Sequence, residues 1–423
     1  MNKVLIFAIP TPKAITALKL QGKICGGGWV ESLIDSLIET KYNVSLCFFY
    51  ECKSVLHSNY ENIDYYALPT YNFAAKSIPN RIKKGIDEII HLVNPDFIHI
   101  IGTERIHVKY ILQHFDPKKI LLSITGMPSI IAPLYYAGLP ESVITRNKTI
   151  GDILRHRGIK KQKRDFEIMG KSEEIALKLS HYVMGRTEWD YVSTKSINPN
   201  IRYFFGNESL RRNFYSNIGS WNINTCIKHS IFLSQASYPL KGLHQLLYAV
   251  KIIKPKYPDI KIIISGPNIL DHDTLIQKLK FTNYGKIIYK LCKQYDLLSH
   301  IEFIGNIGET EIIEQYKRAN LVVVPSIIEN KSNTIGEAMM IGTPVIAAYV
   351  GGMTEMINYG ENGFFYPYNE PNRLAFLIHQ IFSDESLQIK FSKNGIQSAS
   401  KMFNREEMKN NILKAYEVIE NGE

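Results

Sequence analysis

The sequence predicts an α/β protein built from parallel strand–helix–strand units, and three observations support this prediction. Short, uninterrupted runs of β-branched residues recur along the chain, and such runs are typical of strands buried on both faces of a parallel sheet. The runs alternate with segments whose apolar residues repeat at helical spacing, such as Val30–Glu39. The chain has 423 residues, which is long enough for two domains that each bury their own core.

The clearest strand–helix–strand unit lies in the C-terminal half. Leu321–Pro325 predicts a buried strand, and Thr343–Ala348 predicts the next one. Between them, Thr334-x-x-Glu337 matches a capping box that opens a helix, and Gly342 stands where a glycine would end it. Parallel sheets of this kind bind ligands beyond the carboxyl ends of their strands, where the helix presents unpaired N–H groups.

Two carboxylates mark this unit as a candidate ligand site. Glu329 lies in the loop before the helix, and Glu337 lies in the first helical turn. We expect the amides of Asn333–Ile335 to hold a diphosphate, which leaves Glu337 to accept hydrogen bonds from ribose hydroxyls. The alternative is that Glu337 only caps its own helix. That alternative leaves Glu329 and the Gly351-Gly352 turn unexplained.

Several motifs of this half resemble the donor-site signature of retaining glycosyltransferases of family 4. In chain order they are Lys241-Gly242, Gly308-x-x-Glu311, Glu329-x7-Glu337, Ala-Met-x-x-Gly-x-Pro and Gly-Gly-x-x-Glu. The resemblance implies the GT-B fold, in which two Rossmann-like, doubly wound parallel-sheet domains face each other across a cleft. It implies an acceptor-binding domain at residues 1–205, a linker at 206–228, a donor-binding domain at 229–403 and a C-terminal helix at 404–423 that crosses back.

The same resemblance implies roles for the donor-site residues. Lys241 and Gly242 would hold the diphosphate, Glu329 the sugar hydroxyls and Glu337 the ribose, and the sugar would be transferred with retention. The expected donor is foremost a UDP-sugar, with GDP- and ADP-sugars as alternatives. We expect no metal and no other cofactor, because Lys241 and the helix amides would suffice to stabilise the charge of the leaving phosphate.

A glycine run follows the first predicted strand, Val4–Ala8. Glycines let a backbone approach a ligand closely, and Cys25-Gly26-Gly27-Gly28 precedes the helix predicted from Val30. The run resembles the glycine-rich loop of GT-B enzymes, which faces the donor phosphates, so Gly27 and Gly28 are candidate donor contacts. A flexible surface turn is the alternative interpretation.

Four polar residues of the N-terminal half follow predicted strands. Glu104 and His107 follow one of them and are candidates to meet the acceptor or the reacting sugar. Thr125 stands where many family-4 enzymes have a histidine, and Arg186 is placed to reach a phosphate or carboxylate of the acceptor. For His107 a structural role stays equally open, and for Arg186 a salt bridge with Asp190 is the alternative.

The segment Arg155–Arg164 carries six Lys or Arg in ten residues. It predicts either a solvated charged face or a patch that rests on anionic lipid headgroups, worth about 1 kcal/mol per charge. A formal net charge of +10 agrees with an anionic partner but does not choose among nucleic acid, phospholipid and phosphorylated substrates.

Composition limits the class and the compartment. Apolar residues make up 45% of the chain and charged residues 21%, as in globular proteins, and the apolar runs are too short for a membrane span. Five cysteines, an odd number without CxxC pairs or metal-ligand spacing, predict reduced thiols of a cytosolic protein.

These features together predict a retaining glycosyltransferase that moves a sugar from a nucleotide-diphosphate sugar to a glycan or lipid-linked acceptor. Residues 95–104 resemble a segment of bacterial surface-polysaccharide (capsule or exopolysaccharide) glycosyltransferases, which implies work in the cytoplasm or at the inner face of the plasma membrane. One alternative is a catalytically inactive GT-B partner or carbohydrate-binding subunit, because Ala236 replaces an arginine common in relatives. A nucleic-acid-binding protein is disfavoured, since no helix-turn-helix, zinc or RNA-binding signature is present.

Overall fold

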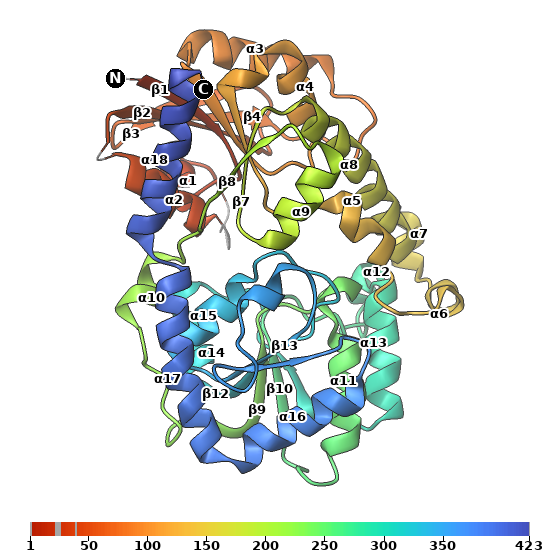
Figure 1. Ribbon diagram of the computed structural model, residues 1–423. Helices are drawn as coiled ribbons and strands as arrows, with labels where there is room; N and C mark the ends of the chain where they lie inside the picture. Colours follow the sequence, from red (N-terminus) through yellow and green to blue (C-terminus); the bar gives the residue numbers. More distant parts are fainter. Residues whose placement is uncertain (1, 22–26, 39, 423) are drawn as a thin grey trace. The chain divides into compact units, whose positions relative to one another are not determined.

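The computed structural model of the chain describes residues 2–21, 27–38 and 40–422. These residues form two compact units, each built around one sheet (Figure 1). Unit 1 comprises Met1–Ile130, Asp165–Arg212 and Phe403–Glu423. Unit 2 comprises Ile131–Arg164 and Asn213–Met402. No helix among the described residues is both long and apolar enough to cross a membrane.

The sheet of unit 1 has eight strands in the order β3-β4-β2-β1-β5-β6-β7-β8. The strands are β1 (Asn2–Phe7), β2 (Tyr42–Tyr50), β3 (Leu56–Tyr60), β4 (Ile63–Pro69), β5 (Phe97–Ile101), β6 (Ile120–Ser123), β7 (Tyr182–Gly185) and β8 (Arg202–Phe205). All neighbours are parallel except β3, which pairs with β4 in the antiparallel sense at the edge. The strand order reverses direction at β1, which is the arrangement of a doubly wound fold.

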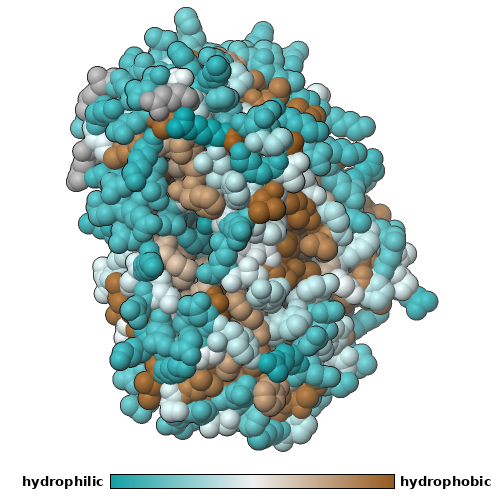
Figure 2. All heavy atoms as spheres, in the orientation of Figure 1, coloured by the Kyte–Doolittle hydropathy of each residue, from teal (hydrophilic) through white to brown (hydrophobic). Residues whose placement is uncertain are grey.

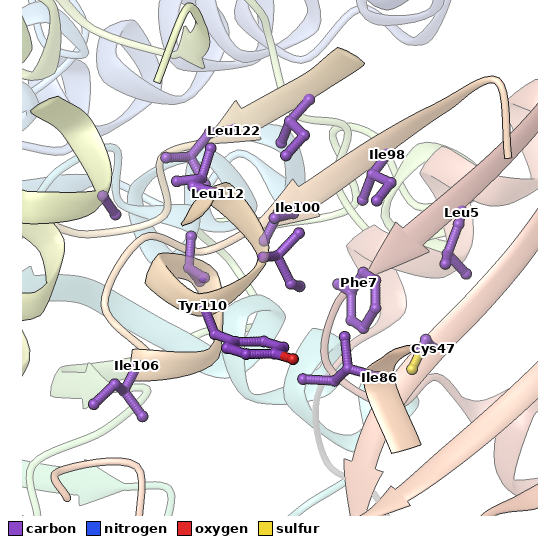
Figure 3. Close-up of a cluster of buried hydrophobic side chains, with 14 of the residues drawn as sticks. Leu5, Phe7, Cys47, Ile86, Ile98, Ile100, Ile106, Tyr110, Leu112 and Leu122 are labelled. Carbon is purple, nitrogen blue, oxygen red and sulfur yellow. The ribbon is translucent and has the colours of Figure 1, made fainter. Parts of the chain in front are cut away.

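Helices cover both faces of this sheet. They are α1 (Pro12–Ala17), α2 (Gly28–Ile38), α3 (Asn80–Val93), α4 (Ile106–His114), a 3₁₀ turn (Pro117–Lys119), α5 (Pro128–Ile131), α8 (Ile159–Leu179), α9 (Glu188–Ile197) and α18 (Arg405–Asn421). The short helix α10 (Arg212–Ser216) lies where unit 1 ends and unit 2 begins. The chain alternates along β1: Leu5 and Phe7 join the core under α3 and α4, whereas Val4 and Ile6 join the core under α2 and α18. Figure 3 shows part of the first core, with Phe7 beside Ile86 and Tyr110.

The sheet of unit 2 has six parallel strands in the order β11-β10-β9-β12-β13-β14. The strands are β9 (Ile227–Leu233), β10 (Lys261–Ile264), β11 (Ile301–Phe303), β12 (Ala319–Val324), β13 (Val345–Ala348) and β14 (Phe364–Tyr366). Every residue of β12 and β13 is buried, as expected for central strands covered on both faces.

The helices of unit 2 include a short insert that precedes the sheet in sequence. They are α6 (Glu141–Arg146), α7 (Ile150–Leu154), α11 (Leu243–Ile253), α12 (Leu275–Lys280), α13 (Asn283–Gln294), α14 (Glu309–Arg318), α15 (Asn333–Ile341), α16 (Pro371–Ser383) and α17 (Glu385–Met402). Short 3₁₀ helices span Ala132–Leu134, Pro239–Lys241, Leu298–His300 and Gly351–Glu355.

The insert is where the units differ from the domains predicted from sequence. Residues 131–164 were expected in the N-terminal domain but cluster with unit 2. The reason is hydrogen bonding to the start of α13: Asn283 donates its side-chain amide to the Ile144 carbonyl at 2.9 Å and its backbone N–H to Asp152 at 2.6 Å. These contacts are buried, so they hold the insert to the second sheet's helices.

Helical spacing over Leu275–Tyr295 predicts one long helix, and this prediction is wrong. The chain breaks it into α12 and α13, because Thr282 is an N-cap whose side chain accepts a hydrogen bond from the Gly285 N–H. Phe281 before it is extended (φ −59°, ψ 124°), so the helical hydrogen bonds stop there. The aromatic segment Tyr60–Phe73, to which sequence patterns assign no element, contains the turn of the β3–β4 hairpin and the whole of β4.

The C-terminal helix α18 packs in unit 1 beside α2, although the two are far apart in sequence (Figure 1). Its Tyr416 hydroxyl lies 2.8 Å from Nδ1 of His99, whose Nε2 lies 2.7 Å from the Ser123 hydroxyl. Both ring nitrogens of this buried histidine are therefore paired, and burial lowers its pKa to about 3. His99 is a neutral core residue that ties α18 to β5 and β6.

A buried carboxyl group joins the loops that follow β5 and β6. Glu173 on α8 lies 2.5 Å from the Thr103 hydroxyl, and it accepts hydrogen bonds from the backbone N–H (3.0 Å) and hydroxyl (2.6 Å) of Ser129. Its side chain is fully buried, and burial raises its pKa to about 7. Both loops are at the carboxyl edge of the sheet, so Glu173 fixes the edge where ligands of doubly wound sheets bind.

Glu173→Gln is expected to flatten the pH dependence of stability. Since the folded-state pKa is raised above the unfolded value, the stability that protonated Glu173 contributes is present below the unfolded pKa and is lost as the pH rises through about 7. Urea unfolding of the parent and the variant across this range measures the difference. Glu174→Gln, which changes the exposed neighbour, is the control and is expected to leave the dependence unchanged.

Candidate functional site

A polar hollow lies in unit 2 beyond the carboxyl ends of β9 and β12. Its lining includes Ser234 after β9, Ser326 and Glu329 after β12, Lys241 before α11 and Thr334 in the first turn of α15. The carboxyl ends of neighbouring parallel strands open at one edge, so segments far apart in sequence meet here. The hollow gathers Lys241, Glu329 and Thr334, three of the residues predicted from sequence to bind a donor.

An ion pair between Lys241 and Glu329 stands in this hollow. The Lys241 Nζ lies 2.9 Å from Glu329 Oε2, and the two side chains are 20% and 26% exposed. Burial opposes the charged form of Lys241, but the Glu329 carboxylate and the nearby Tyr238 outweigh it and raise the pKa of Lys241 above its ordinary value. The lysine therefore stays fully charged at neutral pH.

The backbone around Lys241 is held in position by a glycine turn and by a hydrogen bond to the loop after β12. Lys241 ends a 3₁₀ turn, and Gly242 follows in the left-handed region at φ +72° and serves as the N-cap of α11. A Cβ atom on Gly242 would collide with the Pro325 carbonyl oxygen. The Ile327 N–H also donates to the Leu240 carbonyl at 2.8 Å, so the lysine turn is fastened to the loop after β12.

A second glycine turn holds Glu329. The Gly352 N–H donates to the Glu329 carbonyl at 3.1 Å. Gly351 has φ +52°, and a Cβ atom there would collide with the same carbonyl oxygen. The Gly351-Gly352 turn is thus explained by the close approach of its backbone to the Glu329 loop.

The helix that opens on the hollow begins two residues earlier than predicted. Ser332 is the N-cap of α15 and makes no side-chain capping bond, so the first-turn N–H groups have no partner from a capping side chain. Thr334 Oγ1 lies 2.6 Å from the Ser234 hydroxyl, which ties this turn to β9. The Asn333 side-chain oxygen is buried and has no hydrogen-bond partner among the described residues.

The predicted capping box of Thr334 and Glu337 is wrong. Glu337 lies beyond the first turn, is 7% exposed, and accepts a hydrogen bond from the buried Tyr316 hydroxyl at 3.0 Å. A residue at the fifth helical position points away from the N-cap, so it cannot return to it. Glu337 is also absent from the lining of the hollow, as are Asn333, Ile335 and Gly242.

In unit 1, Gly27 and Gly28 pack against other segments of the same unit. Gly27 has φ +80°, and a Cβ atom there would collide with the Pro10 carbonyl oxygen. A Cβ atom on Gly28 would come within 2.8 Å of the Arg211 side chain. These contacts give both glycines a structural reason, while Cys25 and Gly26 of the run lie outside the described residues.

Glu104 and His107 have different surroundings, although both follow β5. His107 is 4% exposed, and its Nδ1 lies 2.9 Å from the Tyr71 hydroxyl, within a cluster that includes Phe49. Burial and then the nearby Arg105 lower its pKa, so His107 is neutral. Glu104, by contrast, is half-buried, lies 3.7 Å from Arg105 Nε, and its Oε2 has no hydrogen-bond partner among the described residues.

The Arg186 side chain is buried and is paired with other residues of unit 1. Its guanidinium pairs with Glu208 and donates to the Thr125 carbonyl at 2.7 Å, and its side chain is 8% exposed. Asp190, the partner weighed from sequence, instead accepts a hydrogen bond from the Arg186 backbone N–H at 3.0 Å. Thr125, Arg186 and Glu208 line an apolar pocket that also includes His99.

Sequence reasoning missed the partners that come from distant segments. Ser234, Tyr316 and Glu208 each contact a predicted residue, and the contacts join segments that are far apart in sequence. The chain also contains an Asp-x-Asp triplet at Asp271–Asp273, before α12. Both of its aspartates are exposed, and Asp271 accepts a hydrogen bond from Asn268 at 2.6 Å.

Two solved structures identify the fold. The chain aligns with sucrose-phosphate synthase from Thermosynechococcus elongatus over 100% of both chains, with a TM-score of 0.71 and 16% identity. It aligns with HepE from Anabaena, solved in complex with UDP-glucose, with a TM-score of 0.63 and 16% identity, over 99% of this chain and 100% of that chain. The two parallel-sheet α/β units therefore form a GT-B fold.

The match to a protein family lies in the second unit. Residues 220–398 match the model of the family described as glycosyl transferases group 1. An uncharacterized glycosyltransferase of Methanocaldococcus jannaschii is 28% identical over 158 residues, which is 37% of this chain and 36% of that protein. The chain spans about a third of the length of the curated relatives it matches. The whole polar hollow lies within the residues that match this family model.

Gly242→Ala is expected to destabilise the protein more than Gly360→Ala does. Both glycines have positive φ, +72° and +76°, so both substitutions pay about 1 kcal/mol for left-handed backbone. Only the Cβ atom at 242 also meets the Pro325 carbonyl, whereas nothing lies within 4 Å at 360. We expect an additional loss of about 1–3 kcal/mol in the free energy of unfolding, measured by urea titration. Equal losses for the two variants would contradict the described packing of the Lys241 turn.

Proposed function

We propose that the protein is a glycosyltransferase that moves a sugar from a nucleoside-diphosphate sugar to a glycan or lipid-linked acceptor. The observation that carries the proposal is the Lys241–Glu329 pair at the amino end of α15. The hollow brings together a cation, an uncapped helix start and a carboxylate. The cation and the helix start suit the diphosphate and the negative charge that it carries as it leaves, and the carboxylate suits the sugar hydroxyls. The family model that residues 220–398 match supports the same class of reaction.

Each residue has a role in this proposal. Lys241 leaves Glu329 and binds the diphosphate, where its charge offsets the negative charge that develops as the sugar departs. The N–H groups of Thr334 and Ile335, at the positive end of the helix, donate hydrogen bonds to the remaining phosphate oxygens. Glu329, released from the lysine, accepts hydrogen bonds from the sugar hydroxyls.

Glu337 is proposed to meet the ribose with the carboxylate that Tyr316 orients. Tyr316 is fully buried, so its hydroxyl holds Glu337 Oε2 in one place. A ribose contact requires a small opening beside α15, because Glu337 is 7% exposed. The UDP-glucose in the HepE complex supports a uridine diphosphate donor by analogy of fold alone.

The stereochemistry and pathway are further parts of the proposal. We infer retention at the anomeric carbon and an acceptor of surface-polysaccharide assembly from the motifs that resemble family 4. In unit 1, Glu104 is the residue best placed to meet an acceptor hydroxyl, since one of its oxygens is unpaired at the carboxyl edge of β5. The basic segment 155–164 would bring the enzyme to an anionic membrane surface.

UDP, GDP and ADP are expected to stabilise the chain to different degrees, and the matching nucleotide identifies the donor. A ligand at 100 times its dissociation constant adds about 2.7 kcal/mol to the free energy of unfolding. Thermal unfolding with each nucleoside diphosphate and the corresponding glucose conjugate measures the shift. If none of them raises the melting temperature, the donor site proposed here is wrong.

Lys241→Ala is expected to reduce donor-dependent release of nucleoside diphosphate by about 100-fold or more, because the leaving phosphate loses its cation. Lys251→Ala, which removes an exposed lysine of α11, is the matched control and keeps full activity. Tyr316→Phe leaves Glu337 without its hydroxyl partner and is expected to weaken nucleotide binding while the fold persists. Release that persists in Lys241→Ala at the parent rate contradicts the proposed role.

Chelation is expected to leave turnover unchanged. The proposed reaction assigns the leaving charge to Lys241 and to helix amides, so it needs no divalent cation. Sugar transfer is measured in excess EDTA and again after addition of magnesium or manganese. Activity that appears only with the metal would show that a metal ion replaces or assists the lysine.

A further inference from the structure

Aliphatic side chains project from two short helices of unit 2. On α7, Ile150, Ile153 and Leu154 are 72%, 62% and 64% exposed. On α12, Leu275 and Ile276 are 75% and 65% exposed. The three residues of α7 share one side of the helix, since positions three and four apart lie on one face. Several large aliphatic residues exposed together mark a surface that meets something apolar.

The two helices are fastened side by side, so these side chains belong to one surface. A Cβ atom on Gly151 would collide with the Leu279 carbonyl oxygen, which shows how closely α7 approaches the end of α12. The Thr149 hydroxyl donates to the Phe281 carbonyl at 2.9 Å, and Arg157 donates to the Lys280 carbonyl at 2.8 Å. We call α7, α12 and the basic residues around them the α7–α12 surface.

Cations surround the aliphatic residues. A hollow of about 400 Å³ next to α7 has Lys148, Arg157, Lys160 and Lys161 in its lining. Arg155, which follows α7, and Lys278 and Lys280, which lie on α12, are exposed. These three side chains have no carboxylate partner among the described residues. Figure 2 shows hydrophobic and hydrophilic residues side by side along the edge where Figure 1 draws α7 and α12.

Few carboxylates offset this charge. Glu141 pairs with Lys160, whose Nζ lies 2.5 Å away, and the buried Asp152 lies 3.7 Å from Arg157 Nε and accepts a hydrogen bond from the Asn283 N–H. Asp271 and Asp273, before α12, are exposed. The surface therefore keeps a net positive charge around an aliphatic centre, which is the pattern of a protein face that lies in the interface of an anionic membrane.

We propose that the α7–α12 surface docks unit 2 onto an anionic lipid bilayer. The aliphatic side chains enter the boundary of the acyl chains, and lipid phosphates bind at the basic hollow. This proposal identifies the surface that makes the membrane contact of the proposed function, and it rests on that function. A bilayer fits better than nucleic acid, because the centre of the surface is aliphatic and offers no aromatic ring to stack on a base.

Vesicle flotation with the full chain tests this surface. The parent is expected to float with vesicles of equal phosphatidylcholine and phosphatidylglycerol and to stay behind with phosphatidylcholine alone. Ile153→Ser combined with Leu154→Ser, and separately Lys148→Glu combined with Arg155→Glu, should each weaken partitioning at least about tenfold. High salt should release the parent, because charge attraction is screened.

Matched controls carry the same chemistry elsewhere. Leu92→Ser combined with Ile389→Ser removes two aliphatic residues that are 64% and 54% exposed, and Lys84→Glu combined with Lys401→Glu reverses two exposed lysines. Both controls are expected to float like the parent. Loss of flotation in the controls, or flotation of the α7 variants, overturns the proposal. So does binding to inorganic phosphate without binding to vesicles.

Two further readouts separate this proposal from others. Donor-dependent release of nucleoside diphosphate without vesicles should be equal in the parent and the α7 variants, so loss of flotation with intact release concerns docking alone. If no protein, including the parent, releases nucleoside diphosphate, the proposed function is contradicted instead of the docking proposal. If the parent is a dimer in size-exclusion chromatography and the serine variant is a monomer, a second copy covers this surface, and the membrane proposal fails.

Discussion

The pairing of Lys241 with Glu329 is the interaction on which the candidate site depends. A lysine and a glutamate from loops 88 residues apart meet at 2.9 Å only because two glycine turns permit it. Gly242 brings the lysine turn against Pro325, and Gly351 lets a third segment support the Glu329 carbonyl. The backbone thus fixes both ends of the pair before any ligand arrives, which lowers the reorganisation that binding requires.

The carboxyl edge of unit 1 is built on the opposite principle. There, polar side chains are mostly used by the scaffold: His99 by Tyr416 and Ser123, and Glu173 by Thr103 and Ser129. Buried polar groups cost free energy unless they are paired, so these residues are evidence of packing more than of chemistry. An acceptor that is proposed to bind at this edge would therefore be recognised mainly by shape.

Sequence patterns predicted the sheets well because central strands carry local signals. The predicted strands Leu321–Pro325 and Thr343–Ala348 correspond to β12 and β13, whose bounds lie within two residues of the predicted ones. Patterns failed where the deciding contact is distant or a boundary is subtle. Helical periodicity continues through Phe281 and Thr282, so nothing in it shows that Thr282 caps a new helix.

The candidate site shows the same division between local and distant information. Lys241, Glu329 and Gly342 were recognisable because spacing and turn chemistry are local. The true surroundings of Glu337 were not, because a capping box needs only two residues in the same helix, whereas Tyr316 lies 21 residues away on α14. Segment 131–164 was misplaced for a similar reason, since its hold on unit 2 runs through buried bonds to Asn283.

The location of the excess positive charge separates two explanations that composition alone left open. A net charge of +10 would suit a phosphate-binding cleft, but the hollow in unit 2 contributes little to it, because Lys241 is neutralised by Glu329. Residues 148–164 and α12 hold more cations than carboxylates and stand beside exposed aliphatic residues. Long-range attraction follows net charge and not the number of ion pairs. The basic character of the chain is therefore better explained by the α7–α12 surface than by the donor site.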